Sequence, residues 1–86
     1  MKHDVTPGWH TVHIGSEADG ALIDGLDVWK ASWKSLGYCV WLPNPQWPRQ
    51  IHDYMVYEAG NGPSKILFAA AELSNGCWGF YVPDQA

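Results

Sequence analysis

The chain has 86 residues, of which 47 % are hydrophobic, 16 % are charged and six are tryptophan. This length fits a single small domain spanning residues 1–86 and leaves no room for a second one. The net charge of −4 gives no basic patch, which argues against nucleic acid as a partner. No run approaches the ~20 apolar residues of a membrane span, and no apolar signal segment opens the sequence. We therefore expect a cytoplasmic protein without nucleic-acid or membrane partners.

The size and composition of the chain lead us to expect that it self-associates. A domain of this size buries only roughly 60 % of its surface by folding alone, and few charges are available to cover the rest. We therefore expect a homo-oligomer. The ends, residues 1–8 and 83–86, are predicted to be loosely ordered.

The first elements in chain order are a weak strand and a helix. Residues 9–14 predict the strand, and Ser16 could cap a short helical turn near residues 17–23. The main helix is expected over residues 25–36, with Asp24 as N-cap and Gly37 just past its end. Its apolar positions recur every three or four residues, which predicts one stripe packed on a sheet; they are Leu26, Trp29, Trp33 and Leu36.

A strand over residues 38–42 leads into a proline-rich segment, residues 43–48. Three prolines in six positions restrict the backbone to an extended path. One interpretation is a stiff recognition loop that presents Trp47 and Arg49 to a partner with little entropy left to lose. The other is a rigid connection between strands, with Trp47 folded back over the core.

Three further strands are predicted as an antiparallel meander over residues 51–58, 65–73 and 77–82. Residues 59–64 supply the first turn, and Asn75-Gly76 is typical of a two-residue hairpin turn. That turn would place Ala71 opposite Phe80 and Ala69 opposite Val82, so that small side chains face large ones.

The fold class predicted from these elements is α+β: an antiparallel sheet of about four strands with one principal helix packed on one face. Both faces of the meander carry large apolar groups, unlike a sheet with one wet face. Either the helix covers one face and another element or subunit covers the second, or the second face is a binding surface.

No residue pattern indicates catalysis, a metal or a cofactor. His10 and His13 are three apart, which places them on opposite faces of a strand rather than together at a metal. Cys39 and Cys77 are expected to be reduced, buried thiols. No nucleophile has an identifiable base, and the glycines match no phosphate or dinucleotide loop. We therefore expect a protein that is not an enzyme.

Three functions remain open. The first is a small non-enzymatic binding protein that self-associates through an aromatic-rich sheet face. The second is a domain with an aromatic pocket for a cationic or aromatic small molecule, with Asp53, Glu58 or Glu72 as its polar anchor. The third is an acidic inhibitor or immunity-type protein that contacts a basic protein partner through residues 17–27. The candidate binding residues are Trp41, Trp47, Arg49, Asp53, Tyr54, Tyr57 and Tyr81.

Overall fold

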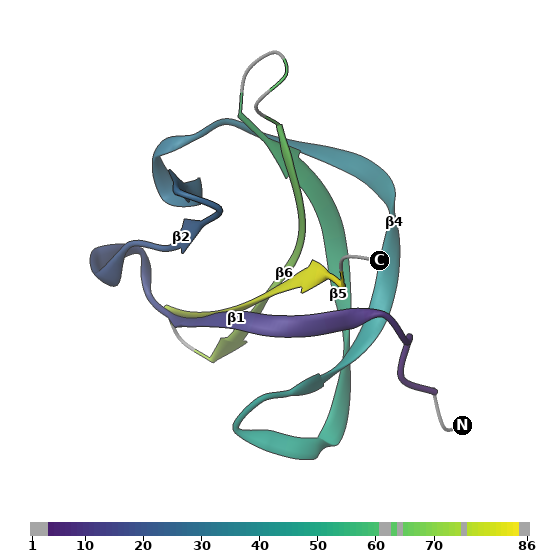
Figure 1. Cartoon of the computed structure of the whole chain (residues 1–86). Coiled ribbons are helices and arrows are strands. Elements are labelled where there is room, and N and C mark those ends of the chain that lie inside the picture. Colours follow the sequence, from purple (N-terminus) through teal and green to yellow (C-terminus); the bar gives the residue numbers. More distant parts are fainter. Residues whose placement is uncertain (1–3, 61–62, 64, 75, 85–86) are drawn as a thin grey trace.

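The protein is built almost entirely of strands (Figure 1). The computed structural model describes residues 4–60, 63, 65–74 and 76–84. One antiparallel sheet has five strands in the order β1-β7-β6-β5-β4. Its strands are β1 (Trp9–Gly15), β4 (Trp33–Asn44), β5 (Trp47–Ala59), β6 (Ile66–Ser74) and β7 (Cys77–Pro83). A second, two-stranded sheet pairs β2 (Leu22–Ile23) with β3 (Leu26–Asp27).

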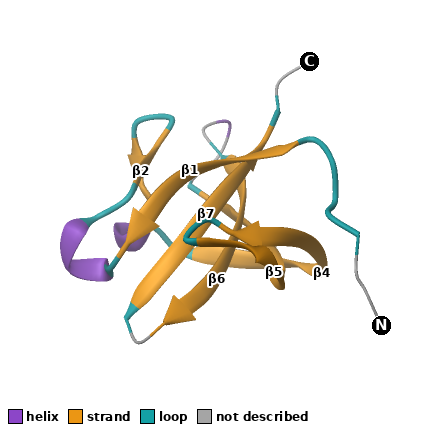
Figure 2. Ribbon diagram, turned by 90° about the horizontal axis from the view of Figure 1, so that it is seen from below, coloured by secondary structure: helices purple, strands orange, loops and turns teal. Residues whose placement is uncertain are grey.

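The prediction of an α+β fold with a principal helix is therefore wrong. The segment expected to be helical, residues 25–36, contains β3, a single 3-10 turn η2 (Val28–Lys30) and the start of β4. Figure 2 shows the short helical turns lying to one side of the strands. The described residues hold no longer helix than these three-residue turns.

A tight turn at Asp24-Gly25 explains the missing helix. Both residues have positive φ, 51° and 83°, as a two-residue hairpin turn requires. Ile23 pairs with Leu26 across it. Asp24 is thus a turn residue and not an N-cap, and Asp27 caps η2 instead by accepting a hydrogen bond from the Trp29 backbone N–H at 3.1 Å. The apolar residues Leu26, Trp29 and Trp33 are thus spaced three or four apart without forming a helix, and all three pack against the core.

The expected first helical turn is present but short. It forms η1 (Glu17–Asp19), directly after Ser16. The Asp19 carboxylate accepts hydrogen bonds from the Ser16 backbone N–H at 3.2 Å and from its hydroxyl at 3.1 Å. Ser16 and Asp19 thus close the turn against each other, as their spacing predicts.

The two edges of the sheet, β1 and β4, are tied together just before β1 begins. The Thr6 backbone N–H donates to the Trp41 carbonyl at 2.7 Å, and the Trp41 N–H donates to the Thr6 hydroxyl oxygen at 3.0 Å. At the other end of the chain, the Asp84 N–H donates to the Gly8 carbonyl at 2.7 Å. The described parts of both termini therefore carry backbone hydrogen bonds, whereas residues 1–3 and 85–86 lie outside the described residues.

The β6–β7 hairpin differs in register from its prediction. Ser74 pairs with Cys77 as expected, but Glu72 pairs with Trp78 and Ala70 with Phe80. The register shifts between Glu72 and Ser74, so the extra residue is Leu73. Because a one-residue slip moves every side chain of a strand to the other face, Phe80 joins the face of Ala70 rather than that of Ala71. Of the predicted turn, Asn75 lies outside the described residues.

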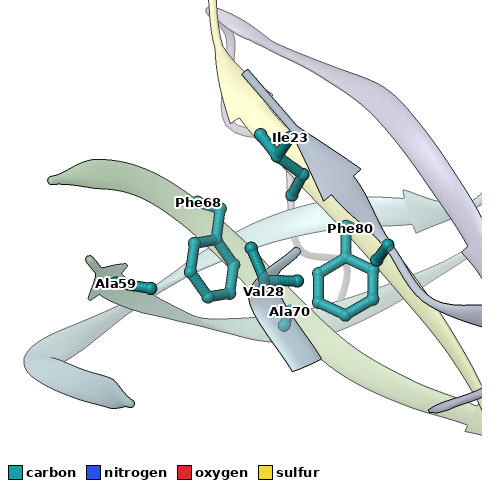
Figure 3. Packing of buried hydrophobic residues seen from close by; sticks show 7 residues of the cluster. Ile23, Val28, Ala59, Phe68, Ala70 and Phe80 are labelled. Carbon is teal, nitrogen blue, oxygen red and sulfur yellow. The ribbon is translucent and has the colours of Figure 1, made fainter. Parts of the chain in front are cut away.

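Cluster 1 fills one face of the sheet. Val28 of η2 lies between Phe68 of β6 and Phe80 of β7 (Figure 3). Trp29 and Trp33 pack against this cluster, as their apolar stripe predicts, and Trp78 of β7 packs there with them. Neighbouring rings meet edge to face, the arrangement that aromatic quadrupoles favour; examples are Trp29 on Phe80 and Trp33 on Phe68. The segment of residues 21–33 therefore covers this face. The buried members of cluster 1 are Ala21, Ile23, Val28, Ala59, Phe68, Ala70 and Phe80.

Cluster 2 fills the opposite face. Its buried members come from four strands of the sheet, and Trp9 of β1 packs against them; they are Val40, Leu42, Tyr54, Val56, Ala69 and Tyr81. The sheet's own strands supply all of these buried side chains, and the sheet is strongly curved (Figure 1). Both faces are thus apolar, as the sequence predicts, and the second is covered largely by the sheet itself.

Candidate functional site

The long β4–β5 hairpin carries most of the exposed aromatic surface. Trp47 is 61 % exposed and Trp41 is 41 % exposed, and Tyr38 of β4 is exposed as well. These are the only exposed large aromatic side chains among the described residues. The hairpin is therefore where the aromatic surplus of this chain reaches solvent.

Strand pairing places a set of side chains on one side of this hairpin. Trp41 lies opposite Asp53, Cys39 lies opposite Met55, and Pro43 lies opposite Ile51. Successive side chains of a strand alternate between faces. We call the side chains of Cys39, Trp41, Ile51, Asp53 and Met55 the hairpin face.

The hairpin face lies on the same side of the sheet as cluster 1, but past the part of the sheet that residues 21–33 cover. Along β5, Ala59 is buried, Tyr57 and Met55 are partly buried, and Asp53 is exposed. Tyr57 still packs in cluster 1, where its ring stacks on Phe68 at 5.9 Å. The cover of residues 21–33 therefore ends near Met55, beyond which Asp53, Trp41 and Cys39 are exposed and Ile51 is half-buried.

The proline-rich segment forms the tip of the hairpin. β4 runs to Asn44, and β5 begins at Trp47. The buried Asn44 side chain accepts a hydrogen bond from the Gln46 N–H at 2.9 Å, which closes the turn. Trp47 belongs to neither buried cluster. The Trp47 side chain is exposed to solvent, and so is that of Arg49, two residues further along β5.

Two candidate tyrosines lie inside cluster 2. The hydroxyls of Tyr54 and Tyr81 both donate to the Pro43 carbonyl oxygen, at 3.4 and 2.7 Å. Their rings meet edge to face at 5.1 Å. Burial raises the pKa of the Tyr54 phenol well above its ordinary value, and the neighbouring Tyr81 adds to this. These two side chains brace β4 against β5 and β7 rather than line the hairpin face.

The seven residues singled out in the sequence therefore separate into groups. Trp41 and Asp53 lie together on the hairpin face, and Trp47 and Arg49 lie at the start of β5. Tyr54 and Tyr81 point to the opposite side of the sheet, and Tyr57 packs in cluster 1. The alternation of strand positions from Asp53 also leads to Ile51 and Met55, which the sequence places on one face but does not mark as a site.

The two histidines of β1 share a face, contrary to the prediction. A register shift between Thr11 and His13 makes His10 pair with Val82 and His13 pair with Phe80, two positions on the same side of β7. His13 lies near Asp19 and Asp27 at a small cavity of about 420 Å³. No group of three or more metal-ligating side chains occurs within the part of the chain that the structure describes.

The cysteines are less buried than expected. Both thiols are free, but Cys39 is exposed and Cys77 is only partly buried. Cys39 lies opposite Met55, beyond the end of the segment that covers cluster 1. The prediction of a largely buried thiol is therefore wrong for Cys39, which lies beyond the segment that covers cluster 1, whereas Cys77 is half-buried.

Comparison with protein-family models finds no match, and comparisons with curated proteins and with solved structures find none either. None of the helical segments in the described ranges is long and apolar enough to cross a membrane.

Proposed function

We propose that this chain is a small non-enzymatic binding protein that self-associates through the exposed side chains of the β4–β5 hairpin, which are those of the hairpin face together with Trp47 and Arg49 at the start of β5. The observation that carries the proposal is the distribution of its aromatic side chains. Three tryptophans are packed in cluster 1, whereas Trp41 and Trp47 are exposed on one hairpin. Exposed tryptophans are common anchors of protein interfaces because they bury a large area on contact.

A second copy of this chain is the partner that the surface suits. A two-fold interface brings the same patch of both subunits together, so the patch must complement itself. Arg49 and Asp53 give strand β5 one exposed cation and one exposed anion, which a two-fold axis near Ile51 can pair across the interface. The low share of charged residues, 16 %, also favours covering apolar surface by association.

Sedimentation velocity over a range of micromolar to submillimolar concentrations tests the proposal. We expect the wild type to form a dimer, and we expect Trp41→Ser and Trp47→Ser each to weaken it at least about tenfold, as loss of an interface anchor does. Arg49→Asp should weaken the dimer too, and the exchanged pair Arg49→Asp with Asp53→Arg should restore much of it.

Leu22→Ala is the matched control, because Leu22 is a strongly exposed apolar side chain on the separate β2–β3 sheet. It should leave the dimer unchanged. A wild type that stays monomeric throughout the concentration range, or a dimer that Leu22→Ala weakens as much as Trp47→Ser does, would contradict the proposal.

A further inference from the structure

A surface groove lies away from the hairpin face, where the β2–β3 hairpin approaches the large sheet. Its walls come from β1, the β2–β3 turn, the start of β6 and the end of β7, and its volume is about 520 Å³. Small-molecule sites commonly have volumes of roughly 300–1,000 Å³. The groove therefore has the size of a site for a small ligand.

Apolar side chains line much of this groove and remain open to solvent. Leu22 is 71 % exposed, Val12 is 39 % exposed and Leu67 is 36 % exposed. They belong to β2, β1 and β6, so three separate elements bring them to one place. Val82 and the buried Ile23 also line the groove. Exposed apolar side chains that converge on a concavity favour an apolar ligand.

Three of the four titratable side chains that line the groove have a bonding partner. His10 bonds to the Asp84 carboxylate at 2.6 Å, and Lys65 lies 3.5 Å from Glu58. Asp24, at the turn between β2 and β3, makes no hydrogen bond or ion pair with any residue that the structure describes. The carboxylate of Asp24 therefore lines the groove beside apolar side chains without an ion-pair partner among the described residues, which favours a ligand that combines a positive charge with an apolar part.

We propose that this groove binds a small aliphatic ammonium ion. The hydrocarbon chain lies against Leu22, Val12 and Leu67, and the ammonium group pairs with the Asp24 carboxylate. The inference is independent of self-association, because none of these residues belongs to the hairpin face. A ligand of this size binds with a dissociation constant of about 1 to 10 mM.

Titration of ¹⁵N-labelled protein by NMR with n-hexylammonium, 1-hexanol and hexanoate tests the site at neutral pH. We expect n-hexylammonium to shift amide signals of residues 22–25 and of β1 with a saturating curve. Hexanol should bind more weakly at the same amides, and hexanoate more weakly still because Asp24 repels it.

Two variants separate the charge from the apolar walls. Asp24→Asn keeps the turn, since Asn also tolerates a positive φ, and should weaken n-hexylammonium about five- to tenfold while leaving hexanol unchanged. Leu22→Ala should weaken both ligands. Glu17→Gln removes an exposed carboxylate from the same acidic segment but outside this groove, so it should change neither affinity.

Three results would overturn the inference. The first is no saturable shift with n-hexylammonium at the accessible concentrations. The second is an equal loss with Glu17→Gln and Asp24→Asn, which would indicate unspecific attraction to the acidic segment. The third is at least tenfold tighter binding of an acetylated, amidated lysine tripeptide at the same amides, which would assign the groove to a protein segment instead.

Discussion

At the scale of single residues, Gly79 of β7 lies very close to the side chains of Leu73 and Tyr54. A Cβ atom at this position would lie 3.0 Å from Leu73 Cδ1 and 3.3 Å from the Tyr54 hydroxyl oxygen. Its backbone is not in the left-handed region, so a substitution here acts through space and not through backbone conformation. A side chain at position 79 therefore requires Leu73 and Tyr54 to move by a few tenths of an ångström.

We predict that Gly79→Ala destabilises the fold by about 1 to 3 kcal/mol, the usual cost of overpacking a core. Urea denaturation measures this change. Leu73→Ala removes the nearest atoms, so the double variant should lose less stability than the two single variants together. Additive losses would show that Leu73 does not contact this position.

The buried Tyr54 phenol predicts a dependence of stability on alkaline pH. Its pKa is raised in the folded protein by burial, whereas the unfolded chain releases this proton near pH 10. Above pH ~10 the unfolded chain has released the phenol proton while the folded protein still holds it, so rising pH lowers the free energy of unfolding. The contribution of the neutral phenol is therefore complete below pH ~10. Above that pH it falls by up to about 1.4 kcal/mol per pH unit.

Comparison of the wild type with Tyr54→Phe in denaturant titrations at several pH values isolates this contribution. The Tyr54→Phe variant should be less stable at neutral pH because it lacks the hydrogen bond to the Pro43 carbonyl. The difference between the two proteins should shrink above pH ~10, since only the wild type loses the phenol's contribution. A constant difference across the alkaline range would contradict a raised pKa for Tyr54.

At the scale of elements, the Asp24-Gly25 turn decides between the helix that periodicity predicts and the hairpin that the structure contains. Gly25 has φ of 83°, so Gly25→Ala should destabilise the protein by about 1 kcal/mol. In a helix the same substitution would stabilise it by about 1 kcal/mol. The sign of the change in urea denaturation therefore distinguishes the two structures, and Asp24→Asn serves as a near-neutral control.

The sequence locates the strands better than it locates their registers. The five predicted strands all fall within or nearly within β1, β4, β5, β6 and β7, because alternating apolar runs and turn residues act locally. The helix prediction is wrong because it gives the stripe of Trp29 and Trp33 more weight than the Asp-Gly turn signal at residues 24–25. That turn signal is present in the sequence and is as strong as the Asn-Gly signal at residues 75–76.

The candidate site was only partly predictable for the same reason. Trp41, Trp47 and Asp53 follow from composition and strand alternation, whereas the groove beside β2 depends on where the hairpin docks. The extra residues near Val12 and Leu73 change which side chains share a face. Such bulges depend on packing between distant strands, so short-range patterns do not specify them.

At the scale of the whole molecule, the contact between Thr6 and Trp41 joins the two edges of the curled sheet. Thr6→Val removes the hydroxyl that accepts the Trp41 N–H, so we expect a loss of about 0.5 to 1.5 kcal/mol and faster hydrogen exchange of the Trp41 amide. Thr11→Val, at an exposed position of β1, is the matched control. Unchanged exchange in Thr6→Val would show that this contact does not hold the sheet closed.

The aromatic side chains of this chain divide between a packed core and exposed positions on the β4–β5 hairpin, through which we propose that two copies associate. The indole N–H signals of the six tryptophans, followed by NMR as protein concentration rises, test it most directly. We predict concentration-dependent shifts for Trp41 and Trp47, with Trp29, Trp33 and Trp78 unchanged. No shift of Trp41 and Trp47, or shifts confined to the three core tryptophans, would contradict the claim.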